Sequence, residues 1–296
     1  MTNASCGLTP IQHYLYLWTL SNAGNHQVLL HHFLRHYAQV GVRLSTNAHV
    51  CIHRSNERES AMRMRMLLHE FGVGNVSELV EPNTKSLEAR KLAKVNSFLN
   101  SLPEHAWLIY ADVDEFFEYP CDILARIRGK HAACARMRDR VDAGIVGMPP
   151  VRTASPLTKQ FPICAKIRGG IIGDTTLKLT LLKVRVEGQQ PTYITAHRAR
   201  ANDQDIGGYN GARCAFVGGF SHYSMTMEAH VLAQRKLRDG EYPHSYRALN
   251  GLVNDSKVNQ IMFTHAARIK INRVRTECPK HCTCADEQPS GQHIDS

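Results

Sequence analysis

The sequence predicts an α/β fold in which helices flank a mostly parallel central sheet, followed by a smaller half with a mixed sheet. Strand and helix patterns alternate over the first third of the chain. The strand segments are short apolar runs, typical of strands buried on both faces, and the helical segments repeat apolar residues every three or four positions. A β-α-β-α-β-α-β order of this kind gives a parallel sheet with right-handed crossovers.

The elements of the first half can be placed in order. A strand is expected at 14–19, where Tyr, Leu and Trp predominate, and Ser21 and Asn22 are read as turn residues after it. Apolar residues at helical spacing predict a helix at 26–40, which Gly41 ends. The other elements expected here are strands at 50–52, 76–80 and 107–111 and helices at 57–71 and 85–102.

Two of the predicted helices carry expectations about their faces. In the helix at 57–71, we expect Met62, Met66 and Leu67 to lie on one side, toward the core. The basic segment at 121–140 reads as a helix with its arginines on a solvated face. The second half is otherwise expected to contain strands at 144–148, 176–186 and 191–197 and a helix at 228–239.

Composition and charge narrow the class of protein. The chain has 296 residues and a net charge of 36 − 26 = +10, which favours acidic partners such as a nucleoside diphosphate, an anionic membrane surface or nucleic acid. No nucleic-acid-binding module is recognisable, so we expect no nucleic acid partner. No apolar run approaches the roughly 18 residues of a membrane-spanning helix. The N-terminus lacks a signal-peptide pattern. We therefore expect a cytoplasmic protein, or a catalytic region whose anchor lies elsewhere, with peripheral membrane association through its basic surface left open.

The nine cysteines show no regular framework, and their odd number argues against a fully paired disulfide scaffold. The exception is a cluster in the tail, where Cys278, His281, Cys282 and Cys284 have the side chains of a zinc site. Their crowded spacing does not match a standard zinc finger. Loose thiols or a local disulfide are the alternative, and the rest of the tail is polar and expected to be flexible.

The segment 107–117, Trp-Leu-Ile-Tyr-Ala-Asp-Val-Asp-Glu-Phe-Phe, most narrows the function. An apolar strand is followed at once by Asp112, Asp114 and Glu115, and buried carboxylates need a cation or hydrogen bonds to compensate them. The carboxyl end of a parallel strand is also where open α/β sheets bind ligands. If the chain stays extended, Asp112 and Asp114 point the same way and suit a hard divalent cation that also binds phosphates. An acidic loop after a core strand is the alternative interpretation.

Two common nucleotide-binding motifs are missing. No Gly-x-Gly-x-x-Gly follows the first strand, and no Gly-Lys-Ser/Thr phosphate loop occurs. Several polar positions nevertheless accompany the acidic segment along the chain. The segments concerned are Asn25, His32-Phe33-Leu34-Arg35-His36-Tyr37, Gly41-Val42, Trp107 to Phe116, Lys178, His197 and His222-Tyr223.

In this order the segments resemble the family 2-like and family 92-like glycosyltransferases, metal-dependent nucleotide-sugar transferases of the GT-A fold. The resemblance covers residues 14–240, and the Asp-Val-Asp-Glu-Phe and His-Tyr segments are its most specific parts. It implies a single catalytic domain at 13–275. This domain has a nucleotide-binding half at 13–120 and an acceptor half that closes the metal site at 121–275. An N-terminal segment at 1–12 lies before it, and a Cys-rich polar tail at 276–296, expected to be flexible, lies after it.

The resemblance also implies roles for individual residues. Asp114 would ligate Mn²⁺ or Mg²⁺, Asp112 would contact the metal or the ribose, and His222 would be the distant third ligand. Glu115 would support them by hydrogen bonding. For Arg90 and Lys91, a solvated helix face is an equal alternative. The residues expected to bind the nucleotide or its diphosphate are Thr19, Asn25, Arg54, Arg90, Lys91, Asp112 and Lys178.

The activity implied is transfer of a sugar from a nucleotide-sugar donor, with a uridine donor as first choice, to a hydroxyl of a glycan, lipid or protein. Inversion of configuration would require a carboxylate base, for which Asp205 and Asp174 are candidates; both are equally well explained as turn carboxylates. The alternatives are an Asp-x-Asp phosphohydrolase, which the bulky Glu115-Phe116-Phe117 disfavours, and a nucleotide- or sugar-binding module without turnover. A basic nucleic-acid binder is the remaining alternative.

Overall fold

The computed structural model describes residues 8–24, 26–54, 57–81, 84–141, 150–165, 177–196, 198–207 and 214–223. Its helices are η1 (Thr9–Tyr14), α1 (Gln27–Val40), α2 (Leu44–Asn47), α3 (Arg58–Glu70), α4 (Thr84–Ser101), α5 (Ile123–Arg126) and α6 (Leu157–Gln160). Its strands are β1 (Leu15–Asn22), β2 (Ala48–Arg54), β3 (Asn75–Val80), β4 (Trp107–Tyr110), β5 (Glu115–Phe116), β6 (Ala132–Val141), β7 (Ile163–Ala165), β8 (Leu177–Lys183), β9 (Thr192–Thr195), β10 (Arg198–Ala201), β11 (Gln204–Gly207) and β12 (Cys214–His222).

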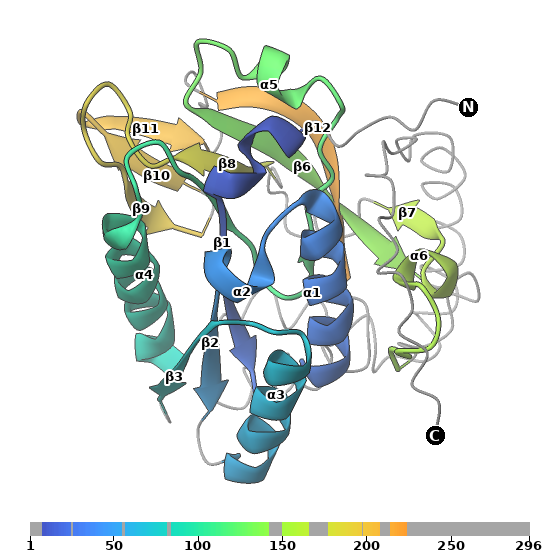
Figure 1. Cartoon of the computed structure of the whole chain (residues 1–296). Helices are drawn as coiled ribbons and strands as arrows, with labels where there is room; N and C mark the ends of the chain where they lie inside the picture. Colours follow the sequence, from blue (N-terminus) through green and yellow to red (C-terminus); the bar gives the residue numbers. More distant parts are fainter. Residues whose placement is uncertain are drawn as a thin grey trace.

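One large mixed sheet runs through the described residues and confirms the predicted α/β fold (Figure 1). Its strand order is β3-β2-β1-β4-β8-β6-β12-β5, with β7 beside β6, and β11-β10-β9 form a separate small sheet. Strands β3, β2, β1 and β4 are parallel, as predicted, whereas β8 runs antiparallel to both β4 and β6. The sheet is therefore continuous between the predicted nucleotide-binding and acceptor halves.

The large sheet separates two apolar cores. One lies under α1 and α3 and contains their buried faces, and the other lies under α4 and the small sheet. Asn96 of α4 ties this second side together, because its side chain accepts the backbone N–H of Tyr193 at 2.8 Å and donates to the same residue's carbonyl at 2.9 Å. The helices therefore cover both faces of the sheet, as doubly covered parallel strands require.

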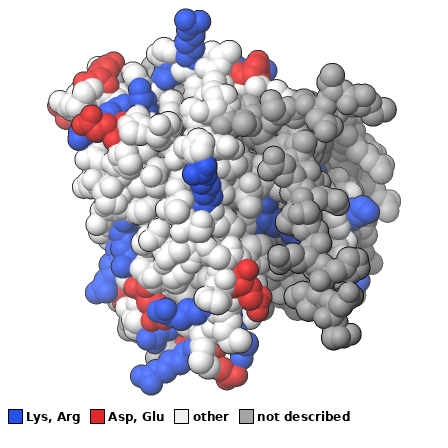
Figure 2. Space-filling model, viewed as in Figure 1, with Lys and Arg blue, Asp and Glu red and all other residues white. Residues whose placement is uncertain are grey.

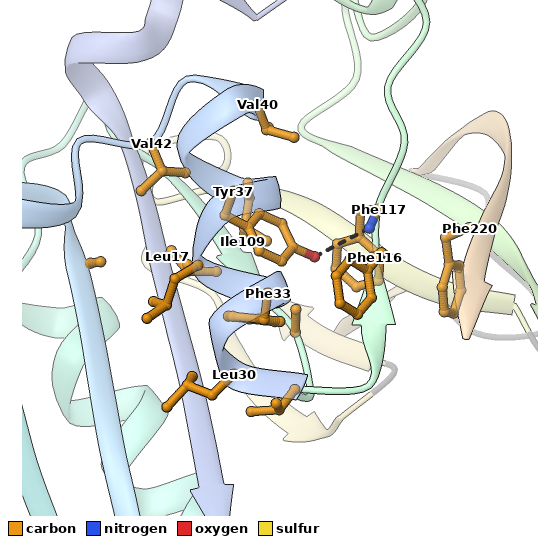
Figure 3. Close-up of a cluster of buried hydrophobic side chains, with 14 of the residues drawn as sticks. Leu17, Leu30, Phe33, Tyr37, Val40, Val42, Ile109, Phe116, Phe117 and Phe220 are labelled. Carbon is orange, nitrogen blue, oxygen red and sulfur yellow. Dashed lines mark hydrogen bonds between the residues drawn. The ribbon is translucent and has the colours of Figure 1, made fainter. Parts of the chain in front are cut away.

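Helix α1 places large apolar side chains against the sheet (Figure 3). Leu30, Phe33 and Tyr37 are completely buried, and each such burial stabilises the fold by about 1.5–3 kcal/mol. Gly41 ends the helix with a φ of 105°, a left-handed conformation that glycine adopts without a steric cost. The predicted helix at 26–40 is thus matched almost to the residue.

Two details of the first half differ from the sequence expectations. Ser21 and Asn22 are not a turn but the end of β1, because parallel pairing with β2 continues as far as Asn22 and His53. The prediction that Met62 and Met66 face the core from α3 is also wrong. Met62 and Met66 are 59% and 61% exposed, and the buried face is instead made by Ala61, Met64 and Leu68.

The predicted helix at 121–140 is wrong as well, since only its α5 portion is helical and β6 occupies its second part. Arg136, Arg138 and Arg140 alternate with Ala135, Met137 and Asp139, which is the period of a strand. Strands β8 and β9 confirm those expected at 176–186 and 191–197. The expected elements at 144–148 and 228–239, and the tail cysteines, lie outside the described residues.

Strand β12 was not predicted from the sequence. It pairs with β6 in parallel, and its register shifts between Phe216 and Gly219. Gly218 has a φ of 115° in this irregular stretch, a backbone conformation that residues other than glycine rarely adopt. A disulfide between Cys134 and Cys214 joins the same two strands, and Cys121 is disulfide-bonded too.

The described surface mixes both signs of charge. On the face in Figure 2, Lys and Arg side chains are spread singly or in small groups, with Asp and Glu beside several of them. Exposed pairs such as Arg63 with Glu59 at 2.6 Å and Arg126 with Asp122 at 2.8 Å account for part of this pattern. No helix in the described ranges has both the length and the apolar character needed to cross a bilayer.

Candidate functional site

The acidic segment forms a turn rather than a continued strand. Strand β4 ends at Tyr110, and the backbone N–H of Glu115 donates to the Asp112 carbonyl at 2.9 Å. The expectation that Asp112 and Asp114 point the same way assumed an extended chain, and the turn does not meet this condition. We use the name acidic corner for Asp112, Asp114 and Glu115 together with their side-chain partners Lys91, Lys178, His222 and Asp139.

Asp112 lies between two lysines. Lys91 Nζ is 2.5 Å from Asp112 Oδ1, and Lys178 Nζ is 3.5 Å from Oδ2. Both ammonium groups also lie near the ring of Tyr110, at 5.3 and 5.4 Å from its centroid. Burial alone would lower the pKa of Lys91, but Asp112, Tyr110 and Glu88 together raise it well above its usual value. Two cations thus hold the Asp112 carboxylate in place.

Glu115 is the buried centre of the corner. Its Oε2 accepts the backbone N–H of Asp112 at 2.9 Å and forms an ion pair with Lys178, which is completely buried. Burial raises the pKa of Glu115, and the nearby charge of Lys178 opposes this, while Asp112 and Asp114 add to it. The hydrogen bond to Asp112 is the supporting contact expected of Glu115.

Asp114 faces the end of β12. His222 Nε2 lies 3.2 Å from Asp114 Oδ2, and the backbone N–H of Tyr223 donates to the Asp114 carbonyl at 2.8 Å. On the other side of the imidazole, Nδ1 lies 2.8 Å from Asp139 Oδ1. His222 and Asp139 are paired positions of β12 and β6, and each is only 2% exposed. The imidazole is therefore held between two carboxylates.

The Asp114 and His222 pair suits a divalent cation. Two ligands at right angles around an octahedral ion, each about 2.1 Å from it, are about 3 Å apart. The observed separation of 3.2 Å between the oxygen and the nitrogen is close to this value, and it is also the length of an N–H···O hydrogen bond. No group of three or more His, Cys, Asp or Glu side chains in the described ranges is arranged to hold a metal by itself. A pair is nevertheless what a cation that keeps waters and binds substrate phosphates requires.

The structure brings only some of the predicted nucleotide-binding residues to the acidic corner. Thr19 is completely buried within β1 rather than placed after it, and Asn25 lies outside the described residues. Arg54, at the end of β2, forms an ion pair with Glu78 at 3.2 Å, and Arg90 of α4 forms one with Glu81 at 2.8 Å. Of this set, the structure brings Lys91, Asp112 and Lys178 together at the acidic corner.

A polar network at the carboxyl ends of β1 and β2 was missed by the sequence analysis. Asn22 Nδ2 is 3.1 Å from His53 Nδ1, and His53 Nε2 is 3.1 Å from the Glu81 carbonyl. Asn22 Oδ1 also accepts the backbone N–H of Gly24 at 3.0 Å. These side chains lie at the edge where parallel sheets bind ligands. Reading Asn22 as a strand end rather than a turn residue would have indicated them.

Of the two base candidates, the structure describes only Asp205, and it does not bring this residue to the acidic corner. Asp205 lies on β11 of the small sheet, where its carboxylate is 3.3 Å from Arg198 and 3.0 Å from Arg200, both on β10. Asp174 and His197 lie outside the described residues. The catalytic base therefore stays a prediction.

A further carboxyl group, Glu118, lies across β12 from His222. It accepts a hydrogen bond from Ser221 Oγ at 2.8 Å, and that hydroxyl accepts one from Arg140 Nε at 2.9 Å. Ser221 and His222 are successive strand residues and point to opposite faces. Burial raises the pKa of Glu118 to about 7, against the lowering effect of Ser221, Arg140 and Arg138.

Comparisons with known proteins give weak structural similarity. No protein-family model matches the sequence, and a sequence search of curated proteins finds no match. The crystal structure of S. aureus TarS 1-349 matches at a TM-score of 0.35 and 14% identity, covering 85% of this chain and 74% of that chain. Glucosyl-3-phosphoglycerate synthase from Mycobacterium tuberculosis, in complex with Mg²⁺ and UDP, matches at a TM-score of 0.33 and 12% identity, covering 79% and 83%. Similarity at these TM-scores carries no inference about function.

Proposed function

We propose that this chain is a metal-dependent glycosyltransferase of the GT-A type, which transfers a sugar from a nucleotide-sugar donor to a hydroxyl acceptor. The observation that carries this proposal is the 3.2 Å approach of Asp114 and His222 beside an Asp112 held by two lysines. These groups meet where β4 ends, at the edge of a parallel sheet that binds ligands in open α/β folds.

Asp114 and His222 are proposed to hold Mn²⁺ or Mg²⁺, with Asp112 placed beside them to contact the ribose or the ion. When bound, the cation would neutralise charge on the diphosphate of the donor as a Lewis acid. Lys91 and Lys178 keep the Asp112 carboxylate in one position, and Glu115 fixes the turn through the Asp112 backbone. The corner therefore supplies a preorganised acidic ligand set, which is what diphosphate recognition through a metal needs.

The finer parts of the proposal follow from the sequence resemblance. A uridine donor, Mn²⁺ as the preferred ion and inversion at the anomeric carbon are its starting expectations. The acceptor is a hydroxyl of a glycan, a lipid or a protein. Arg54 and Arg90 already form ion pairs with Glu78 and Glu81, so their proposed contact with the nucleotide requires these pairs to exchange partners.

We also propose that the protein works in an oxidising compartment. The Cys134–Cys214 disulfide and the bonded Cys121 support this, because structural disulfides persist there and are rare in the cytosol. This favours a catalytic region in an extracytoplasmic setting over a cytoplasmic protein. Mass spectrometry after alkylation of free thiols in cells would test it: unblocked Cys134 and Cys214 support the location, and alkylated ones contradict it.

The test of the main proposal is a thermal-shift screen of nucleoside diphosphates and nucleotide sugars, each with and without Mn²⁺ or Mg²⁺. A stabilisation by uridine diphosphate that needs the cation, followed by metal-dependent sugar transfer or donor hydrolysis, is expected. Nucleotide binding without any turnover would indicate a binding module. Hydrolysis of a phosphomonoester with a trapped phospho-aspartate at Asp112 would replace the proposal with a phosphohydrolase.

A further inference from the structure

We propose that Asp139 is a positioning residue for the metal site: it fixes the His222 imidazole so that Nε2 presents its lone pair beside Asp114. The inference rests on the proposed metal-dependent function and adds a residue that the Asp-x-Asp segment does not contain. Asp139 does not touch the proposed cation. It acts through His222, from a neighbouring strand of the large sheet.

The strand register provides the contact. Strands β6 and β12 run parallel, and Asp139 and His222 are paired positions, so their side chains lie next to each other on the same face. The 2.8 Å separation of Asp139 Oδ1 and His222 Nδ1 is a strong hydrogen bond when one partner is a carboxylate. Both side chains are almost completely buried, so water does not compete for this bond.

The hydrogen bond with Asp139 determines which ring nitrogen of His222 carries the proton. A neutral imidazole carries one N–H, and the nitrogen without it is the ligand atom for a metal. The Asp139 carboxylate can only accept, so it takes the Nδ1–H and leaves the lone pair on Nε2. That lone pair then faces a second carboxylate, Asp114, at 3.2 Å. At this distance either a proton or a divalent cation can join the two atoms, and in the proposed site the cation takes the place of the proton on Nε2.

The alternative is a purely structural pair that stabilises the junction of β6 and β12. The two roles differ in what a neutral replacement does. Asp139→Asn keeps the size of the side chain, but its amide can either accept from Nδ1–H or donate to Nδ1. The His222 tautomer is then no longer fixed, and the basicity of Nε2 falls. Loss of such a partner typically weakens metal binding by about 10- to 100-fold.

The test is calorimetric titration of MnCl₂ into the full-length chain, alone and in the presence of uridine diphosphate. Asp139→Asn is expected to bind Mn²⁺ about 10- to 100-fold more weakly than the wild type. The matched control is Asp122→Asn, which changes an exposed aspartate paired with Arg126 on α5 and should bind as the wild type does. If Asp139→Asn binds Mn²⁺ with wild-type affinity, Asp139 has no positioning role.

A second measurement needs no Asp139 variant and so does not depend on its folding. In ¹⁵N-histidine-labelled wild type, with the His222 signals identified by their loss in His222→Gln, we expect the proton on Nδ1. Adding Mg²⁺ should shift the Nε2 signal and leave Nδ1 protonated. A proton on Nε2 in the neutral imidazole, or signals unchanged by Mg²⁺ that binds elsewhere, overturns the inference while the proposed function stands. If the wild type takes up neither cation, the proposed function fails together with it.

Discussion

The two aspartates of the acidic turn are two positions apart in the sequence, yet their surroundings are of opposite kinds. Asp112 lies between the ammonium groups of Lys91 and Lys178, whereas Asp114 faces the imidazole of His222, which is itself bonded to Asp139. On the Asp112 side, fixed protein cations supply the positive charge. On the Asp114 side, we propose that an external cation supplies it. The two carboxylates of the Asp-x-Asp pair are therefore expected to have different roles, Asp112 held by lysines and Asp114 as the proposed metal ligand.

The largest effect is expected on the free energy of unfolding, when the ion pairs around Asp112 and Glu115 are removed. Lys178→Met leaves the buried Glu115 without its ion-pair partner, and removing one member of a buried pair costs about 3 to 5 kcal/mol of unfolding free energy. Urea unfolding measures the loss. Adding Glu115→Gln should recover part of it, and Lys159→Met on the exposed end of α6 is the control. A Lys178→Met protein within 1 kcal/mol of wild type, roughly the effect of a surface change, would show that this side is not an anchor.

At Asp114, the change should appear in affinity rather than in stability. Asp114→Ala should weaken Mn²⁺-dependent binding of uridine diphosphate on the order of 100-fold or more, because a ligand is lost rather than its supporting partner. Its side chain is 24% exposed, so the fold should remain. His222→Ala should cause a comparable loss of metal affinity by calorimetry. Unchanged metal affinity in His222→Ala would remove this residue from the site.

The pH dependence of stability tests whether Glu118 is buried on the face of β12 opposite His222. Its folded-state pKa of about 7 lies above the ordinary value of 4.5, so the native state binds more protons than the unfolded state between these two pH values. Stability should therefore fall as the pH rises through this window, by about 3 kcal/mol in total. Glu118→Gln should flatten this slope in unfolding experiments at a series of pH values. The exposed change Glu104→Gln is the control, and an equally steep profile in Glu118→Gln would contradict the assignment.

The smallest effect concerns the link between α1 and the strand after the turn. The Tyr37 hydroxyl donates to the Glu115 carbonyl at 3.0 Å and accepts the N–H of Phe117 at 3.2 Å, the bond drawn in Figure 3. Tyr37→Phe leaves both buried backbone groups without this partner and should cost about 2 kcal/mol in thermal or urea unfolding. Tyr14→Phe, at a 43% exposed position, should cost nothing measurable. Equal stability of the two variants would contradict this role for Tyr37.

The order of strands and helices in the first half was readable because the signals for where each element lies agreed with the packing, although the methionine face of α3 and the turn at Ser21 and Asn22 did not. Gly41 marks the end of α1, and the apolar run before Asp112 marks a central strand. The second half was harder, because the run of small and basic residues in β6 fits a helix as well as a strand when burial is unknown. Only pairing with β8 and β12 decides between them.

The candidate site was predicted only in part, because some of its residues follow a recognisable strand and others are brought to it by tertiary packing. Asp112 and Asp114 are adjacent to a recognisable strand, so sequence order alone indicates them. Asp139 lies 83 residues from its partner His222, within a series of arginines that suggested a solvated surface. Lys91 and Lys178 reach Asp112 from a helix and a distant strand. Such contacts depend on tertiary packing, which no local pattern records.

The irregular stretch at Gly218 decides the direction of the imidazole. From Phe216 to His222 the chain of β12 takes one residue more than its partner needs from Cys134 to Asp139, so the alternation of faces is reversed once along the way. Deleting a single amino acid there would restore a regular ladder and turn the ring to the opposite side of the sheet. A chain of nearly the same composition would then keep every carboxylate of the turn and lose the proposed histidine ligand.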